Sequence, residues 1–197
     1  PGPCTDPMKG PIIPSKNCTL GTNPGRTHRF FNGTPVIPFG FGLSYTTWSY
    51  SIHSAPSSVD LNTLDELLSK TKAKTDTHFP RLEEIPPAGK YVIEVTNTGA
   101  IDADDVVLGF VSLPGAGTNG IPLQSLFGFE RVHVRAGQSK TVTLYPALTE
   151  FATTDLEGGR HATAGEYHLS FGVAEAAGHG MGYISATLTA SFLKNPQ

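Results

Sequence analysis

Short segments that alternate apolar and polar residues constrain the fold of this chain more than any other feature. In one of them Tyr167, Leu169 and Phe171 share a face, while His168 and Ser170 lie on the other. This period of two residues is typical of a β-strand with one buried side. Seven segments show it: 48–52, 91–96, 106–110, 125–134, 142–144, 167–174 and 183–192.

Glycine and proline separate these segments. The chain has 22 Gly and 16 Pro among 197 residues, whereas the two residues make up roughly 12% of average sequences. Because both interrupt regular structure, the sequence disfavours long helices, coiled coils and helical bundles, and favours short strands joined by tight turns. A complete (β/α)8 barrel needs about 250 residues, so any mechanism that requires a whole barrel within this chain is excluded.

Seven half-buried strands predict a mainly β fold, an antiparallel β-sandwich of the immunoglobulin-like or fibronectin type III-like kind. No cysteine lies within the strands, which disfavours a true immunoglobulin domain. The uneven spacing of the strands disfavours an up-and-down barrel. We therefore expect the sandwich to occupy residues 46–197.

Two segments fall outside the alternating pattern. Residues 1–40 contain eight of the 16 prolines and no regular period, so residues 1–45 are expected to form an extended arm. Residues 54–88 are expected to form an insertion, in which Asn62 caps a short helix that ends near Thr71. Leu64, Leu67 and Leu68 would form the apolar stripe of this helix. The polar remainder of the insertion, as far as Pro87, predicts a surface loop.

Charge and hydropathy restrict the kinds of partner that the chain is expected to bind. The net charge is −3, and no cluster of Lys and Arg is present, so we expect neither nucleic acid nor a membrane as a partner. No apolar stretch is long enough for a membrane-spanning helix. The first residues contain neither an initiating Met nor the apolar core of a signal peptide, so the beginning of the chain is expected to be a cut end.

The arm carries signs of an oxidising, extracellular compartment. Cys4 and Cys18 are expected to form a disulfide that stabilises the arm by about 3 kcal/mol, although two free thiols, or pairing with cysteines outside the chain, stay open. Asn17 and Asn32 each begin an acceptor sequence for N-glycosylation. Together these features predict a secreted glycoprotein. The spacing of the two cysteines does not suit a metal site.

No catalytic constellation emerges from the polar residues. Asp102, Asp104 and Asp105 are expected to lie in a solvated loop, because the remaining ligands of a calcium-binding loop are missing. Asp155 and Glu157 flank a sequence typical of a turn and are expected to be structural. The seven His residues are scattered without metal-ligand spacing, and no phosphate-binding or dinucleotide motif is present. We expect no metal and no cofactor.

The most informative stretch, residues 23–50, places aromatic residues among prolines and glycines. Its aromatic residues include Phe30, Phe31, Phe39, Phe41, Tyr45 and Trp48. One interpretation is a platform that stacks on sugar rings; the favoured one is an aromatic seam that packs the arm against another part of a protein.

Motifs in this stretch resemble glycoside hydrolase family 3, at the junction between its α/β-sandwich domain and its C-terminal fibronectin type III-like domain. The junction motif consists of Pro24, Gly25, Arg26, Pro38, Phe39, Gly40, Gly42 and Tyr45. Later motifs at 95–99, 126–132 and 165–167 follow in the order of the family. Residues 107–111, with the loop after them and residues 122–126, are most similar to β-xylosidases of fungal and plant type.

The resemblance implies the C-terminal part of a secreted, retaining exo-β-glycosidase, with β-xylosidase as the expected activity. Family members take their Asp nucleophile and Glu acid/base from domains that precede the matched region, so no catalytic residue is carried over to this chain. The expected partner is an N-terminal catalytic chain or segment of the same enzyme, through which the oligosaccharide substrate would be bound. Residues 1–45 would complete and brace the α/β-sandwich domain.

Other functions stay open at this point. A β-glucosidase or an α-arabinofuranosidase of the same family would use the same architecture. A freestanding β-sandwich that binds carbohydrate or protein would need no catalytic segment. The freestanding form is disfavoured because six exposed aromatic residues would make an unusually large apolar patch for an isolated domain.

Overall fold

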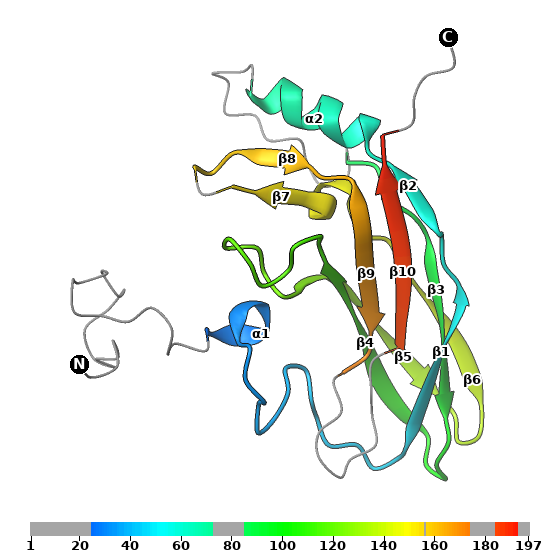
Figure 1. Ribbon diagram of the computed structural model, residues 1–197. Coiled ribbons are helices and arrows are strands. Elements are labelled where there is room, and N and C mark those ends of the chain that lie inside the picture. Colours follow the sequence, from blue (N-terminus) through cyan, green and yellow to red (C-terminus); the bar gives the residue numbers. More distant parts are fainter. Residues whose placement is uncertain (1–24, 73–84, 156, 174–183, 193–197) are drawn as a thin grey trace, which may run out of the picture.

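The protein folds as two β-sheets packed face to face (Figure 1). The computed structural model describes residues 25–72, 85–155, 157–173 and 184–192. One sheet has three strands in the order β1-β3-β6, the other has five in the order β2-β10-β9-β4-β5, and β7 and β8 form a separate pair. The strands are β1 Trp48–Ser54, β2 Ser58–Asp60, β3 Tyr91–Asn97, β4 Ala103–Ser112, β5 Ser125–Val134, β6 Ser139–Leu144, β7 Ala152–Thr154, β8 Arg160–Ala162, β9 Gly165–Phe171 and β10 Ile184–Ser191.

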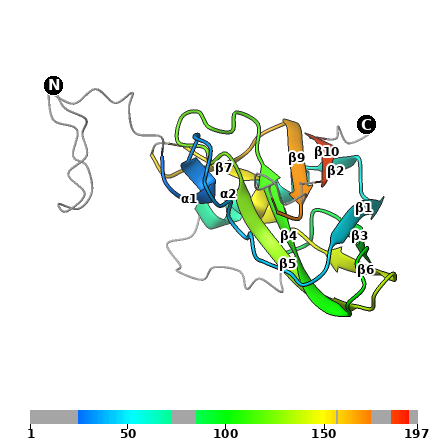
Figure 2. The same cartoon turned by 90° about the horizontal axis from the view of Figure 1, so that it is seen from below.

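Three helical elements accompany the strands: α1 Thr27–Phe30, α2 Asn62–Lys72 and the 3-10 turn η2 Leu148–Phe151. Helix α2 and the β7-β8 hairpin lie together at one end of the sandwich, as Figure 1 shows. Helix α1 belongs to the arm and lies on the side of β4 and β5, away from the three-stranded sheet (Figure 2). The sandwich therefore has one outer face that the arm approaches.

Alternate side chains of the two sheets form the core. On β3 the buried residues are Tyr91, Ile93 and Val95, and the intervening residues are only partly buried. On β9, Tyr167, Leu169 and Phe171 are fully buried. Removal of each such side chain from water contributes roughly 1.5–3 kcal/mol to folding. The alternation seen in the sequence is thus the inward and outward pattern of a sandwich.

The predicted fold class is confirmed, and all seven predicted strands are present. The pairings that link these seven strands are antiparallel, and β2 adds a parallel pair with β10 at the edge of the larger sheet. The sequence pattern missed β2, β7 and β8, because three-residue strands are too short to show a period.

The insertion differs from its prediction in two details. The predicted helix is confirmed, but Asn62 is its first residue and not its cap, and the Asn62 amide donates to Asp60 Oδ1 (3.0 Å). Leu61 and Leu64 are fully buried and Leu68 nearly so. The segment 54–72 therefore supplies a strand and part of the core. Of the predicted loop, residues 73–84 lie outside the described residues, and Pro87 pairs with Ala147 in a β-bridge.

The core face of strand β4 could not be identified from the sequence. Val106, Leu108 and Phe110, which mark this strand in the pattern, share one face. In the structure Val107 and Val111 join the core cluster, whereas Phe110 is fully buried outside that cluster. The reason is that both faces of β4 are apolar, so the alternation alone leaves the direction of the core undecided.

Candidate functional site

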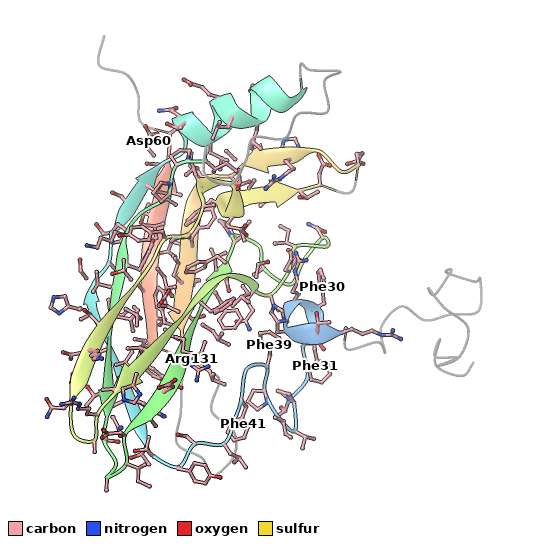
Figure 3. All side chains as sticks on the ribbon, turned by 180° about the vertical axis from the view of Figure 1, so that it is seen from behind. Phe30, Phe31, Phe39, Phe41, Asp60 and Arg131 are labelled. Carbon is pink, nitrogen blue, oxygen red and sulfur yellow. The ribbon has the colours of Figure 1, made fainter. Side chains whose placement is uncertain are left out.

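The arm packs on the outer face of the five-stranded sheet at Phe110. Phe39 of the arm stacks on His28 with ring centroids 4.1 Å apart, and both rings meet Phe110 edge to face, at 6.1 and 5.8 Å. Figure 3 shows Phe39 on the side of the arm that faces the sheet. Pro38 is buried beside them. This aromatic contact, His28–Phe39–Phe110, explains how a residue on the outer face of the sheet can lose all contact with water.

Gly40 fits between the arm and the sheet for two reasons. Its φ is +81°, in the left-handed region that favours glycine. A Cβ added to Gly40 would lie 2.3 Å from Leu108 Cδ1 on β4 and 3.5 Å from Val173 Cγ2. Gly40 thus lets the backbone of the arm approach the outer face of the sheet closely. Gly42, in contrast, has no atom within 4 Å of such a Cβ.

Most other apolar side chains of the arm are exposed. Four of them lie outside both the contact with Phe110 and helix α1, and we call these four the docking strip: Val36, Ile37, Leu43 and Tyr45. Val36, Leu43 and Tyr45 have 96%, 88% and 94% of their surface exposed. Outside the arm, the large exposed apolar residues within the described ranges are dispersed over several elements (Ile101, Phe129, Tyr145, Phe192). Exposed apolar residues that form large patches are typical of interaction surfaces.

Asn97 anchors the end of the arm to the sandwich. It is the buried polar residue at the end of β3, and its Oδ1 accepts hydrogen bonds from Thr46 Oγ1 (2.6 Å) and from the Gly99 amide (3.1 Å). Its Nδ2 donates to the carbonyls of Ile101 (2.8 Å) and Val134 (3.1 Å). One amide side chain therefore joins the arm, the turn after β3 and the end of β5.

The remaining residues of the junction motif have less defined contacts. Gly25 has φ +82°, and a Cβ there would lie 1.9 Å from the carbonyl oxygen of Phe30, so this position requires glycine. Arg26 precedes α1 and makes no capping hydrogen bond through its side chain. Pro24 lies outside the described residues, as do Cys4, Asn17 and Cys18. Asn32 is exposed in the arm, where its side chain is accessible.

The acidic residues considered in the sequence are structural. Asp104 and Asp105 lie in strand β4, which corrects the expectation of a loop. Asp104 pairs with Arg131 (2.6 Å) and His133 (2.6 Å), while Asp105 accepts a hydrogen bond from Tyr50. The hydrogen bonds from His133 and Arg131 hold the pKa of Asp104 below its usual value. Each carboxylate thus has its own protein partner.

Asp155 and Glu157 lie in the turn between β7 and β8, as expected. Asp155 Oδ1 accepts from the amides of Glu157 (3.1 Å) and Gly159 (2.6 Å), and its other oxygen pairs with His161. These hydrogen bonds, that from His161 foremost, lower the pKa of Asp155. In the described part of the chain, no group of three or more His, Cys, Asp or Glu residues could hold a metal ion. None of its helices is long and apolar enough to span a membrane.

A polar pocket beside the arm was not predicted. It lies between α1, the loop after β4 and the η2-β7 segment, and it contains Arg29, Glu150 and Arg160. These three charged residues are up to 131 positions apart in the sequence, and no local motif connects them. Only the tertiary structure brings them together.

These features define a fibronectin type III-like β-sandwich with an arm packed against it. A family model for the "Fibronectin type III-like domain" matches residues 105–174. Beta-D-xylosidase 1 of Arabidopsis thaliana is 35% identical over 160 residues, covering 77% of this chain and 20% of the relative. A probable exo-1,4-beta-xylosidase of Aspergillus oryzae is 32% identical over 183 residues, covering 91% of this chain and 21% of the relative.

The solved structure of the GH3 exo-beta-xylosidase XlnD, in complex with a xylobiose aziridine probe, has a TM-score of 0.66 and 26% identity. It covers 86% of this chain and 20% of the XlnD chain. The chain carries the fibronectin type III-like domain of glycoside hydrolase family 3. It spans about a fifth of the length of the curated relatives it matches.

Proposed function

We propose that this chain is the C-terminal structural portion of a secreted, retaining β-xylosidase, and that it braces catalytic domains supplied by a preceding segment. The observation that carries the proposal is the docking strip. Its apolar side chains are largely exposed, whereas isolated soluble domains rarely expose large apolar patches. The relatives named as β-xylosidases are about four times as long as this chain. A larger part of such a protein is therefore available to cover the strip.

The arrangement of the arm fits this bracing role. His28 and Phe39 hold one side of the arm on Phe110, while Val36, Leu43 and Tyr45 point their surfaces to solvent. An arm fixed on one side and apolar on the other can join two domains. In the proposed enzyme the residues of the arm before position 46 would complete the α/β-sandwich domain. The two catalytic carboxylates would lie in the preceding segment, about 5 to 5.5 Å apart as retention requires.

The first experiment is native mass spectrometry of the protein purified from its source. We expect this chain to be joined to, or bound by, a larger catalytic segment. The complex should hydrolyse aryl β-xylosides faster than aryl β-glucosides or α-arabinofuranosides, whereas the 197-residue chain alone should be inactive. A monodisperse free chain would contradict the bracing role, and a preference for another glycoside would correct the substrate.

The second experiment tests the docking strip by substitution. Leu43→Ser and Tyr45→Ser should leave the thermal unfolding of the isolated chain unchanged, because both side chains are already exposed. In the complete enzyme the same substitutions should lower the unfolding temperature and speed the loss of activity on heating. Tyr145→Ser is the matched control, since Tyr145 is exposed (57%) on the sandwich and away from the strip. Equal behaviour of all three variants in the complete enzyme would refute the assignment of the strip.

Secretion is part of the proposal and rests on the acceptor sequence at Asn32, which is exposed. Peptide mass spectrometry of the secreted protein should find a glycan at Asn32 and at Asn17, and a disulfide between Cys4 and Cys18. Unmodified asparagines together with free thiols would contradict this part of the proposal.

A further inference from the structure

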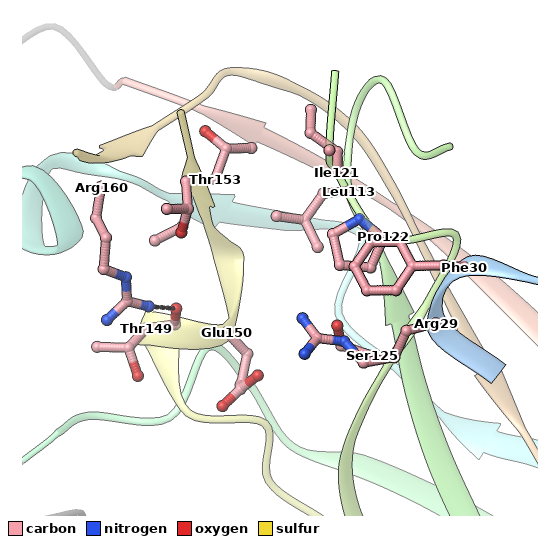
Figure 4. Close-up of a pocket in the computed structure, with 13 residues that line it drawn as sticks. Arg29, Phe30, Leu113, Ile121, Pro122, Ser125, Thr149, Glu150, Thr153 and Arg160 are labelled. Atoms are coloured by element: carbon pink, nitrogen blue, oxygen red, sulfur yellow. Dashed lines mark hydrogen bonds between the residues drawn. The ribbon is translucent and has the colours of Figure 1, made fainter. Parts of the chain in front are cut away.

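The pocket beside the arm has one wall that is mainly polar and another that is mainly apolar. Figure 4 shows Thr149, Glu150, Thr153 and Arg160 on one side of the opening, with Phe30, Leu113, Ile121 and Pro122 on the other. The volume is about 360 Å³, within the range of roughly 300–1,000 Å³ that small-ligand pockets span. The site therefore has the size and the mixed lining of a binding pocket.

The charged residues of the pocket are held in place, but they keep hydrogen-bonding capacity that a ligand could use. The backbone carbonyl of Arg29 accepts a hydrogen bond from the Leu123 amide (2.6 Å), which holds Arg29 beside the loop after β4. Arg160 donates one Nη2 hydrogen bond to the Thr149 carbonyl (2.7 Å), and its guanidinium has further donors. The Arg29 guanidinium lies 5.5 Å from the centre of the Phe30 ring.

Glu150 is the acceptor among these donors. Its side chain is half-buried, and no hydrogen bond or ion pair to its carboxylate is found among the described residues. Burial raises the pKa of Glu150, and the charges of Arg160 and Arg29 only partly oppose that rise. The Glu150 carboxylate therefore has acceptor capacity that the described residues leave unused, and a ligand could fill it.

The chemistry of the lining restricts the ligand. Arg29 and Arg160 offer only donors and the Glu150 carboxylate offers only acceptors, so a hydroxyl group, which both donates and accepts, can bridge them. Neighbouring hydroxyls on a ring would satisfy the polar wall. The C–H face of the same ring would pack on Phe30, Ile121 and Pro122. A purely anionic ligand would be repelled by Glu150, and a purely apolar one would leave the charges unpaired.

We propose that this pocket binds a pyranose unit of an oligosaccharide, at a site formed by Arg29, Phe30, Glu150 and Arg160. The site belongs to this chain alone, so its function does not depend on the bracing role of the docking strip. It would hold a sugar unit of a longer chain without taking part in hydrolysis.

The test is a titration of the isotope-labelled 197-residue chain with xylobiose, followed by backbone NMR and by calorimetry. We expect saturable chemical-shift changes at residues 149–154 and 120–125, which line or border the pocket. Exposed arginine and carboxylate residues outside the pocket should show few changes. Xylobiose should give these shifts, whereas an acyclic diol at the same concentration should not. The absence of saturable shifts in this pocket would overturn the proposal.

Substitutions add a second, independent readout. Glu150→Gln and Arg29→Lys should each weaken binding at least fivefold, because each conservative change removes a charge or the fork of donors while the size of the side chain is nearly kept. Glu157→Gln and Arg135→Lys are matched controls outside the pocket, and they should leave the affinity unchanged. Equal affinity of Glu150→Gln and wild type would refute the assignment. A signal seen in the isolated chain but lost in the complete enzyme would identify the pocket as an interdomain contact and would also overturn it.

Discussion

Replacement of Asn97 by Ala should destabilise the sandwich strongly, because its side chain joins the arm, the turn after β3 and the end of β5. The side chain makes four hydrogen bonds, two as a donor and two as an acceptor. A hydrogen bond contributes about 0.5–1.5 kcal/mol net, and a buried group left unpaired costs about 1–3 kcal/mol. Water can reach Thr46 and Gly99 more easily than the Val134 carbonyl, whose hydrogen bond is buried. We therefore expect a loss of about 3–4 kcal/mol.

Urea unfolding is the appropriate assay, because the single Trp of the chain, Trp48, is buried and begins β1 beside the Asn97 contact. The fluorescence of Trp48 should report the transition. A domain is stable by only about 5–15 kcal/mol, so the shift of the midpoint should be large. Thr46→Val is a control that removes a single hydrogen bond, and it should cost about 1 kcal/mol. A loss below 1 kcal/mol for Asn97→Ala would refute the anchoring role.

Asn97→Asp separates hydrogen bonding from side-chain size. The carboxylate keeps both acceptors but removes both donors, and it faces the carbonyl oxygens of Ile101 and Val134. Burial and these oxygens should raise the pKa of the introduced carboxyl in the folded state. Its contribution to stability is then fully present below the unfolded pKa and is lost as the pH rises through the folded pKa. The Asp variant should therefore be more stable at pH 4 than at pH 7, relative to wild type; an unchanged difference would contradict this reasoning.

Three further predictions follow from single positions. Tyr91 and Tyr167 are both fully buried, and burial raises the pKa of each to about 12. The Tyr91 hydroxyl has no partner in the described structure, whereas the Tyr167 hydroxyl lies 2.7 Å from the Thr163 carbonyl. Tyr91→Phe should thus raise the free energy of unfolding by up to about 1 kcal/mol, and Tyr167→Phe should lower it by about 1–2 kcal/mol. Urea unfolding measures this contrast directly, and changes of the same sign would contradict it. Gly40→Ala should loosen the arm, because the new Cβ would lie 2.3 Å from Leu108 Cδ1. Proteolysis within residues 25–45 should then be faster in Gly40→Ala than in Gly42→Ala, and equal rates would contradict the role of Gly40. The pKa of Asp104 is lowered in the folded protein. Its contribution to stability is therefore present above the ordinary pKa of 3.8 and is lost as the pH falls through the lower, folded pKa. On acid titration, Asp104→Asn should lose less stability than wild type between about pH 4 and pH 2, and an identical profile would count against the pairing with His133.

The sequence predicted the fold class because alternation is a local property. A strand with one buried side repeats every two residues, so β3 and β9 could be recognised without knowledge of their neighbours. The junction motif also indicated the family, because its prolines and glycines are close together in the chain and can be recognised there. The core face of β4 could not be predicted, because Val107 and Phe110 are both apolar. In the structure Val107 joins the core cluster and the arm covers Phe110 on the other face.

What the sequence alone determined is therefore the mainly β class, the seven principal strands and the family resemblance. The tertiary structure decided how the arm is used: Gly40 lies against Leu108, Phe39 covers Phe110, and Asn97 binds Thr46 across 51 residues of sequence. It also decided that Arg29, Glu150 and Arg160 share one pocket. The physical reason is that hydrogen bonds and packing act over a few ångströms in space, whereas sequence patterns record only neighbours along the chain.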